Sequence, residues 1–542
     1  PPPGEPFRFE GKLDLDDIDP DALGELLRSA GLLETVPKGF FGGRQVSLST
    51  EIDVGFNADS GELAIDKLAV DLDGSTFALE GRTATEGDAR RIDLSLLPSQ
   101  IRADHIRSLL AIVYTDAPVT FESGSPLEVE ARISGLLGPG RLPDIEGRAT
   151  VRGYTFHHPS LKTPMKEVGA TLRIRRDRLE IDSLTAVIGS SDLTGDLTVT
   201  DFASPRVAFD IRSKNADFFE LFSFMQPPEE SGAATTSAAD PAAEDLMRSV
   251  TVTGKITIDR GSFQKLGFTA LAASMNWSDG VLRMDPFRMD LYDGTFNGTL
   301  TYRPFADPPS FAIGGNVAQV DLAPLLADSV GVEGLIAGRF TGEVSATGSG
   351  SDYETIARGM KGGGSARIEN GFLGALDVLG TLSNVTGIFG EQTLSNLSRQ
   401  MATDGTEFSS ATTTIKVDGG KLRLDNLQIR SPALDLNGRG DVGLLDQALD
   451  GALQIEFSRE VSDSMRAENS RAGKVFWNDR SSRVEFPFEL AGSLAEPSVG
   501  VDWNKAAKTY VEREARSKLD EIISDKLGVS LGGKKAGEPQ SV

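Results

Sequence analysis

The sequence predicts a mainly β protein: an elongated, repeating antiparallel β-sheet that forms a curved groove, with short helices between modules and amphipathic helices near the C-terminus. Three observations support this fold class. Apolar residues recur at every second position in many short runs, one strand pattern occurs four times, and 59 glycines separate the runs. Alternation of this kind is typical of strands that bury one face, and glycine is typical of the turns between them.

The clearest strand pair lies within residues 279–302. The apolar positions of its first strand are Leu282, Met284, Phe287, Met289 and Leu291. Their alternation slips by one residue at Asp285-Pro286, where the missing proline amide favours a β-bulge that keeps them on one face. Asp293-Gly294 then predicts a hairpin turn. The apolar face of the return strand contains Phe296, Gly298, Leu300 and Tyr302.

Three other segments repeat the pattern of the first strand. Their apolar positions are Leu63, Ile65, Leu68 and Val70; Leu179, Ile181 and Leu184; and Leu422, Leu424, Leu427 and Ile429. Each copy has an aspartate at the slip, and a glycine follows it by thirteen positions, or by fifteen in the first copy. The copies begin roughly 100 to 140 residues apart, so each unit must hold several strands. Because the aspartates occupy equivalent places in successive units, we interpret them as strand kinks rather than as a catalytic or metal-binding set.

Short helices are expected after strands at 101–110, 215–224 and 319–328, each with an aspartate near its start. Longer amphipathic helices are expected at 373–401 and 503–527. We interpret both as core or groove caps, with membrane contact as the alternative. Trp503 at the start of the second helix is consistent with an interfacial role. Gly362–Gly364 are expected to form a turn before a strand.

These strand and helix patterns predict that the chain has five parts. Residues 1–225 hold N-terminal β-groove repeats, 226–247 a disordered acidic linker rich in Pro, Ala and Ser, and 248–333 a central β module. A C-terminal β region follows at 334–502, and an amphipathic helix with a loose tail at 503–542. Since 226–245 has almost no large apolar residue, its deletion is expected to leave the melting temperature nearly unchanged.

Composition excludes several functions. The net charge of −25 and the pI near 4.7 disfavour binding to a nucleic-acid backbone. Cysteine is absent, so disulfides and thiolate zinc sites are ruled out. The three histidines, His105, His157 and His158, form no convincing metal-binding pattern. We therefore expect no cofactor, no metal, no nucleic-acid partner and no catalytic residue, and we expect that the protein is not an enzyme.

Three stretches carry a family resemblance: GRFTGEVSATGSG from residue 338, GGGSARIENGFLGALD from residue 362, and residues 406–453. Together they resemble the C-terminal region of the AsmA family, whose relatives include the longer TamB and YhdP proteins of Gram-negative envelopes. The resemblance assigns 334–502 to the AsmA-like C-terminal region. It implies a groove of curved β-sheet with an apolar interior, standing in the periplasm. It also implies anchoring to the inner membrane by an N-terminal helix that this sequence lacks.

The function expected from this resemblance is binding of phospholipid acyl chains and passive lipid transport between the inner and outer membranes, in outer-membrane biogenesis and envelope integrity. The expected partners are phospholipid and both membranes. The alternative is a non-transporting scaffold that assists outer-membrane protein assembly, with envelope proteins as partners. The residues expected to line the lipid groove are Leu63, Ile65, Leu68, Val70, Leu179, Ile181, Leu184, Leu282, Met284, Phe287, Met289, Leu291, Phe296, Leu300, Leu422, Leu424, Leu427, Ile429, Leu434 and Leu436.

A closed sandwich would give the same alternation as an open groove, because both bury one face of each strand. The two differ only in whether protein or lipid covers the apolar face. The long-period repeat favours the open groove, because repeating sheets extend rather than close.

Overall fold

The computed structural model describes residues 7–19, 45–103, 105–106, 120–121, 124–138, 143–157, 163–202, 204–221, 247–374, 391–400, 405–512 and 514–515. The chain forms two compact units, Pro1–Met289 and Asp290–Val542. This division falls inside the module expected at 248–333, and the five-part organisation stays a prediction. The disordered linker expected at 226–247 lies outside the described residues, apart from residue 247.

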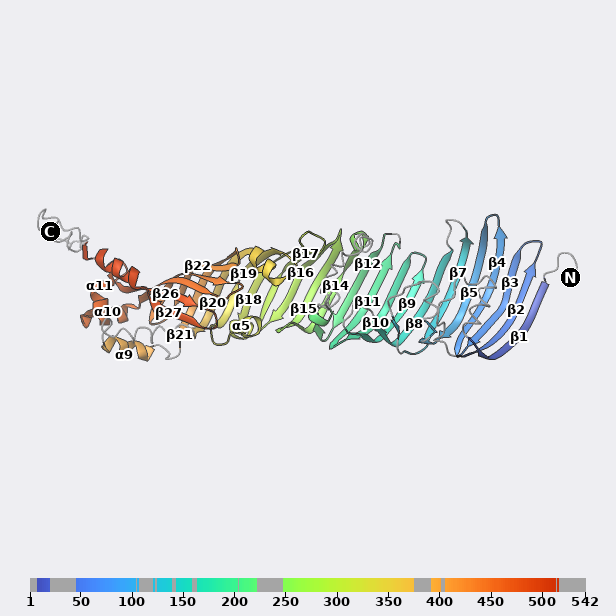
Figure 1. Ribbon diagram of the computed structural model, residues 1–542, viewed down its shortest axis with the longest axis horizontal. Helices are drawn as coiled ribbons and strands as arrows, with labels where there is room; N and C mark the ends of the chain where they lie inside the picture. The colour runs from blue at the N-terminus through green and yellow to red at the C-terminus, as the bar shows by residue number, and fades with distance from the viewer. Residues whose placement is uncertain are drawn as a thin grey trace, which may run out of the picture. The chain divides into compact units, whose positions relative to one another are not determined.

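In the N-terminal unit, hydrogen-bonded neighbouring strands form one open, curved sheet (Figure 1). The strands are β1 (Phe7–Ile18), β2 (Val46–Asn57), β3 (Glu62–Leu72), β4 (Ser75–Glu86), β5 (Ala89–Ile101), β6 (Thr120–Phe121), β7 (Leu127–Leu137), β8 (Asp144–His157), β9 (Met165–Arg175), β10 (Arg178–Ile188), β11 (Ser191–Thr200), β12 (Arg206–Ser213), β13 (Ala216–Asp217), β14 (Thr251–Phe263) and β15 (Leu266–Ser278). The pairings are antiparallel except that β12 and β13 pair with β14 in parallel. Strand β16 (Val281–Leu291) crosses the boundary between the units.

The C-terminal unit has a second antiparallel set and most of the helices. Its strands are β17 (Gly294–Arg303), β18 (Ser310–Asp321), β19 (Ala337–Ser349), β20 (Lys361–Leu373), β21 (Thr406–Asp418), β22 (Lys421–Arg430), β23 (Leu434–Gly443), β24 (Leu449–Phe457), β25 (Trp477–Asn478), β26 (Arg483–Gly492) and β27 (Pro497–Val501). Its helices are α5 (Leu322–Val330), α6 (Tyr353–Gly359), α9 (Glu391–Gln400), α10 (Arg459–Ala467) and α11 (Arg471–Val475). The predicted fold class, mainly β with an open curved sheet and few short helices, is confirmed.

The predicted slips are β-bulges. In β10 the register with β11 jumps between Ile181 and Leu184, and in β22 the register with β23 jumps between Leu424 and Leu427. A third bulge lies in β3, between Ile65 and Leu68. Each bulge places two residues opposite one, so the apolar residues on both sides of it face the same way. The recurrent aspartate therefore marks a kink in these three strands, as predicted.

The glycine that recurs after each aspartate lies on the next strand, opposite the bulge. Gly195 pairs with Leu184, and Gly81 pairs with Ile65. A Cβ at either position would run into the backbone carbonyl of the following strand, that of Asp210 or of Asp93. Side chains converge on the inner side of a bent sheet, so we infer that the face carrying these glycines is the concave one.

The short helices expected after strands are present where the structure describes them. Helix α5 begins after Asp321, whose carboxylate accepts the backbone N–H of Ala323 at 3.1 Å. Helix α3 (Phe218–Leu221) begins after Asp217, whose carboxylate accepts the backbone N–H of Glu220 at 3.2 Å. Both are aspartate caps that satisfy free helix amides. Of the helix expected at 101–110, only residues 103, 105 and 106 are described as helical.

The turn expected at Gly362–Gly364 is wrong, because these glycines lie inside strand β20. They pair with β19, Gly364 opposite Val344 and Gly362 opposite Ala346. A Cβ on Gly364 would collide with the carbonyl oxygen of Glu343. The glycines therefore let two strands approach closely, and only the tertiary arrangement shows this role.

Gly364→Ala is expected to destabilise the C-terminal unit by about 2 to 4 kcal/mol, because either the strand pair separates or the new methyl group overlaps a backbone carbonyl. Gly314→Ala in β18 is the matched control, since the nearest atom to a Cβ there lies 3.7 Å away, an ordinary contact. Denaturant unfolding of both variants measures the difference. Equal midpoints for the two variants would contradict the close approach of β19 and β20.

Candidate functional site

One row of small and apolar residues crosses the N-terminal sheet from its first strand to its last. Register pairing joins Gly11, Ile52, Leu68, Leu79, Leu96, Ala131, Gly147, Ile174, Leu179, Val199, Val207, Val252 and Trp277. The row contains no charged or polar residue apart from the indole of Trp277. We call the face that carries it the apolar face.

The residues next to this row point to the opposite side and are polar. An equivalent row there joins Glu80, Ser95, Arg132, Glu146, Arg175, Arg178, Thr200, Arg206 and Thr251. We call this side the polar face. The contrast follows from the period of two, which sends successive side chains to opposite faces.

Exposed ion pairs join the strands across the polar face. Arg132 lies 3.0 Å from Asp93, and Arg8 lies 2.6 Å from Asp53. The Arg8 guanidinium donates a hydrogen bond to the Asp53 carboxylate and so lowers the pKa of Asp53. Such exposed pairs add little stability individually, but they keep this face hydrated. The bulge aspartate of β10 belongs to this side as well, because Asp182 is paired with Arg173.

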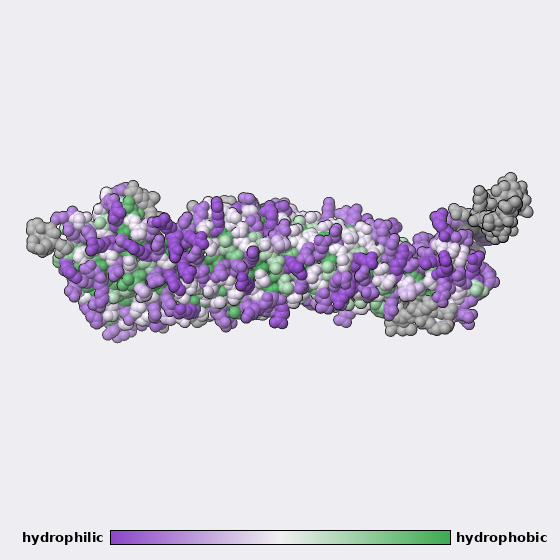
Figure 2. All heavy atoms as spheres, turned by 180° about the vertical axis from the view of Figure 1, so that it is seen from behind, coloured by the Kyte–Doolittle hydropathy of each residue, from purple (hydrophilic) through white to green (hydrophobic). Residues whose placement is uncertain are grey.

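The apolar face of the N-terminal unit remains accessible. Every residue of the apolar row is half-buried except Trp277, which is buried. Larger side chains of the same face are more exposed still: Phe9 is 50% exposed and Leu13 is 49% exposed. Side chains facing a second protein layer in a sandwich are mostly fully buried, so this face is not a sandwich core. Hydrophobic side chains also form patches between hydrophilic ones in Figure 2.

The C-terminal unit has an apolar face of its own, which runs from strand to strand. One row joins Leu300, Ile313, Ala346, Gly362, Val417, Leu422, Val442 and Leu449. Leu300, Ile313, Val417 and Leu422 are half-buried. This part of the unit therefore offers the same accessible apolar surface as the N-terminal unit.

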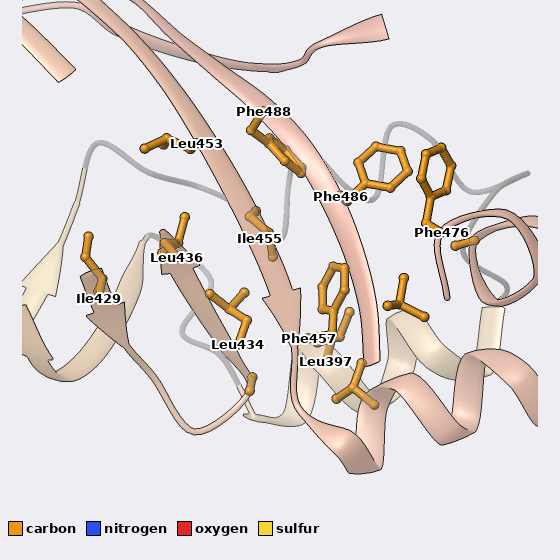
Figure 3. Close-up of a cluster of buried hydrophobic side chains, with 14 of the residues drawn as sticks. Leu397, Ile429, Leu434, Leu436, Leu453, Ile455, Phe457, Phe476, Phe486 and Phe488 are labelled. Carbon is orange, nitrogen blue, oxygen red and sulfur yellow. The ribbon is translucent and has the colours of Figure 1, made fainter. Parts of the chain in front are cut away.

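The last strands of the C-terminal unit are different, because helices cover their apolar face. Ile455 and Phe457 of β24 and Phe486 of β26 are completely buried. They pack with Leu397 of α9 and Met465 of α10, among other residues of one hydrophobic cluster. Figure 3 shows the side chains of Leu397, Ile455, Phe457 and Phe486 gathered between strands and helices. This end of the face is therefore a closed protein core, which we call the capped end.

The predicted groove residues fall into two groups. Half-buried residues of the strands are Leu63, Ile65, Leu68, Val70, Leu179, Ile181, Leu184, Leu282, Met284, Phe287, Met289, Leu291, Leu300, Leu422, Leu424 and Leu427. Fully buried residues are Phe296, Ile429, Leu434 and Leu436. Ile429, Leu434 and Leu436 belong to the cluster of the capped end. Contact of any of these residues with lipid stays a prediction.

Several residues of the apolar face were missed by the sequence analysis. Ile133, Ile174 and Val207 lie on it although their strands lack the aspartate-marked pattern. Plain alternation in 127–137, 165–175 and 206–213 was the available signal. Alternation shows that a strand has an apolar side but not that this side continues the face of its neighbours, which depends on pairing register.

Other kinds of site are not evident in the part of the chain that the structure describes. There, no group of three His, Asp or Glu side chains lies close enough to hold a metal ion. Likewise, no helix among those residues is long and apolar enough to cross a membrane.

An open sheet with one polar and one accessible apolar face defines a class: a β-groove protein. The family model described as AsmA family matches residues 156–427, about half of the chain. The chain belongs to the AsmA family, which confirms the predicted family. The matched region includes the start of the C-terminal region that carries the resemblance and extends back into the N-terminal unit. No curated protein and no solved structure gives a significant match.

Proposed function

We propose that the apolar face binds phospholipid acyl chains and lets lipid pass between the inner and outer membranes. Membership of the AsmA family fits lipid transport and envelope biogenesis. The observation that carries the proposal is the apolar row from Gly11 to Trp277, which spans the N-terminal sheet without a charge and is only half-buried apart from Trp277. The proposed location is the periplasm, with an inner-membrane anchor preceding this sequence. No catalytic step is involved.

Burial of acyl chains supplies the binding energy. Each CH₂ group removed from water is worth about 0.8 kcal/mol, so a chain lying on the apolar face is held along its whole length. Neighbouring positions on the face are similar, so a lipid can move along it without entering water. The polar face stays hydrated through its ion pairs. Movement of this kind is passive, and its direction depends on other components.

The capped end limits the proposed path. Leu434 and Leu436 are covered by protein, so lipid contact there requires displacement of α9 and α10. The accessible surface of the C-terminal unit lies instead along β17 to β22, where Leu300, Leu422 and Leu424 are half-buried. We propose that lipid lies on these strands and does not pass beneath the helices.

A photo-crosslinking amino acid tests the proposal when placed at Leu96 or at Ser95. These neighbours in β5 are both half-buried and point to opposite faces, as their partners Leu79 and Glu80 show. The probe at Leu96 is expected to crosslink phospholipid in the purified protein at least about tenfold more than the probe at Ser95, because acyl chains avoid the charged face. Equal crosslinking at the two positions would refute the assignment of the faces. A specific protein adduct at Leu96 without lipid would favour the scaffold alternative.

A further inference from the structure

The C-terminal helix, whose described residues lie within 503–515, leaves most of its apolar stripe uncovered. Trp503, Ala506, Tyr510 and Val511 lie on one side, because Ala506 and Tyr510 follow at spacings of three and four residues and Val511 lies eight residues, about two turns, after Trp503. Only Ala506 is buried in the core of the capped end. Trp503 is 53% exposed, Tyr510 is 45% exposed and Val511 is 63% exposed. Asp502 fixes the start of the helix by accepting the backbone N–H of Lys505 at 2.9 Å.

An open pocket of about 540 Å³ lies between this stripe and helix α11. Val475 and Phe476 form apolar parts of its wall, and Arg471 and Lys474 supply positive charge. The two cations are three residues apart on α11 and both are exposed. We call Arg471, Lys474, Trp503, Tyr510 and Val511 the terminal patch.

A second tryptophan of this unit, Trp477, is paired with a cation. The guanidinium of Arg466 lies 4.5 Å from the centre of the Trp477 ring. Trp477 packs against the same hydrophobic cluster as Phe476 and Ala506. Two of the three tryptophans of the chain therefore lie around the capped end, with arginine and lysine near them.

We propose that the terminal patch docks this end of the protein onto the surface of an anionic lipid bilayer. Tryptophan and tyrosine favour the boundary between headgroups and acyl chains, and lysine and arginine are attracted to anionic headgroups. The chain as a whole has a net charge of −25, so most of its surface is repelled by such a bilayer. A local patch that combines exposed aromatic rings with cations is the complementary surface. The inference rests on the proposed function in that a lipid carrier must approach a membrane.

Sedimentation of the whole chain with vesicles tests the docking. Vesicles of phosphatidylcholine with phosphatidylglycerol are compared with vesicles of phosphatidylcholine alone. The wild-type chain is expected to bind the anionic vesicles. The affinity for these vesicles is expected to fall at least about tenfold in each of two double variants, Arg471→Glu/Lys474→Glu and Trp503→Ser/Tyr510→Ser. The control is Lys416→Glu/Lys421→Glu, which makes the same charge change at exposed lysines in β21 and β22 and is expected to bind as wild type.

All substituted side chains are exposed, so the melting temperatures are expected to stay as in wild type, and their measurement checks that the variants are folded. Docking is overturned if the wild-type chain binds neither vesicle, binds both equally, or binds anionic vesicles equally well in all variants. Docking is also overturned if the terminal patch crosslinks to another protein while the chain does not bind vesicles. Crosslinking of lipid at Leu96 is measured in the same variants, so failure of docking and failure of the proposed lipid carriage are separate results.

Discussion

Leu96→Asp is expected to leave the protein folded but to reduce its lipid binding by more than about tenfold. Leu96 lies within the apolar row, between Leu79 and Ala131, and is half-buried. In the free protein water can reach the new carboxylate. Bound acyl chains would remove that water, and an unpaired charge among them costs several kcal/mol. Lipid extracted from the purified variant and quantified by mass spectrometry measures the effect.

Two control substitutions separate this outcome from simple unfolding. Ser95→Asp places the same charge on the polar face of the same strand, and lipid content is expected to stay as in wild type. Ile455→Asp places it in the fully buried core of the capped end, and a loss of about 4 kcal/mol or more in unfolding free energy is expected. If Leu96→Asp unfolds like Ile455→Asp, the apolar face is covered by protein. If it folds and keeps its lipid, the face is not the lipid site.

Deletion of residues 226–245 is expected to lower the melting temperature of the N-terminal unit on the order of 10 °C. The sequence alone predicts almost no change in melting temperature, because these residues lack apolar side chains. The structure changes the expectation through the parallel pairing of β12 with β14. A parallel connection must bring the chain back along the length of the strand.

The described residues on either side of the connection show how far it must reach. Before it, Phe218 of α3 contacts Phe268, which pairs with Gly261 toward the end of β14. After it, the carbonyl of Met247 accepts a hydrogen bond from the indole of Trp277, which pairs with Val252 at the start of β14. The strand between these points rises roughly 30 Å. The deletion leaves five residues between Leu221 and Met247, and these cover roughly 20 Å when fully extended.

The shortened connection is therefore expected to strain or break one of the two attachments, at a cost of about 3 to 5 kcal/mol from lost apolar burial and hydrogen bonding. Replacing 226–245 with a Gly/Ser segment of equal length is the control. A flexible connection of 25 residues has a root-mean-square length of roughly 27 Å, so the replacement is expected to melt close to wild type. Thermal unfolding followed by circular dichroism compares the three proteins. A deletion variant as stable as wild type would show that the parallel connection is not needed.

Local patterns in the sequence determined the strands, their bulges and their apolar sides. Leu179, Ile181 and Leu184 show why: the period of two and a single slip fix which side chains share a face, and both are properties of one strand. Asp321 similarly fixed the start of α5, because a capping side chain acts within a few residues. The sequence pattern also predicted the family, which the comparison confirmed over residues 156–427.

Only the tertiary structure decided what covers the apolar face. Leu68 and Leu436 have the same alternating context in the sequence, yet Leu68 is half-buried and Leu436 is fully buried in the cluster that includes residues of α9 and α10. Coverage depends on which distant segments return over a strand, and a strand's own period carries no information about them. The role of Gly364 and the parallel order of β12 and β14 have the same origin, since each depends on contact between strands whose register is set by the whole sheet.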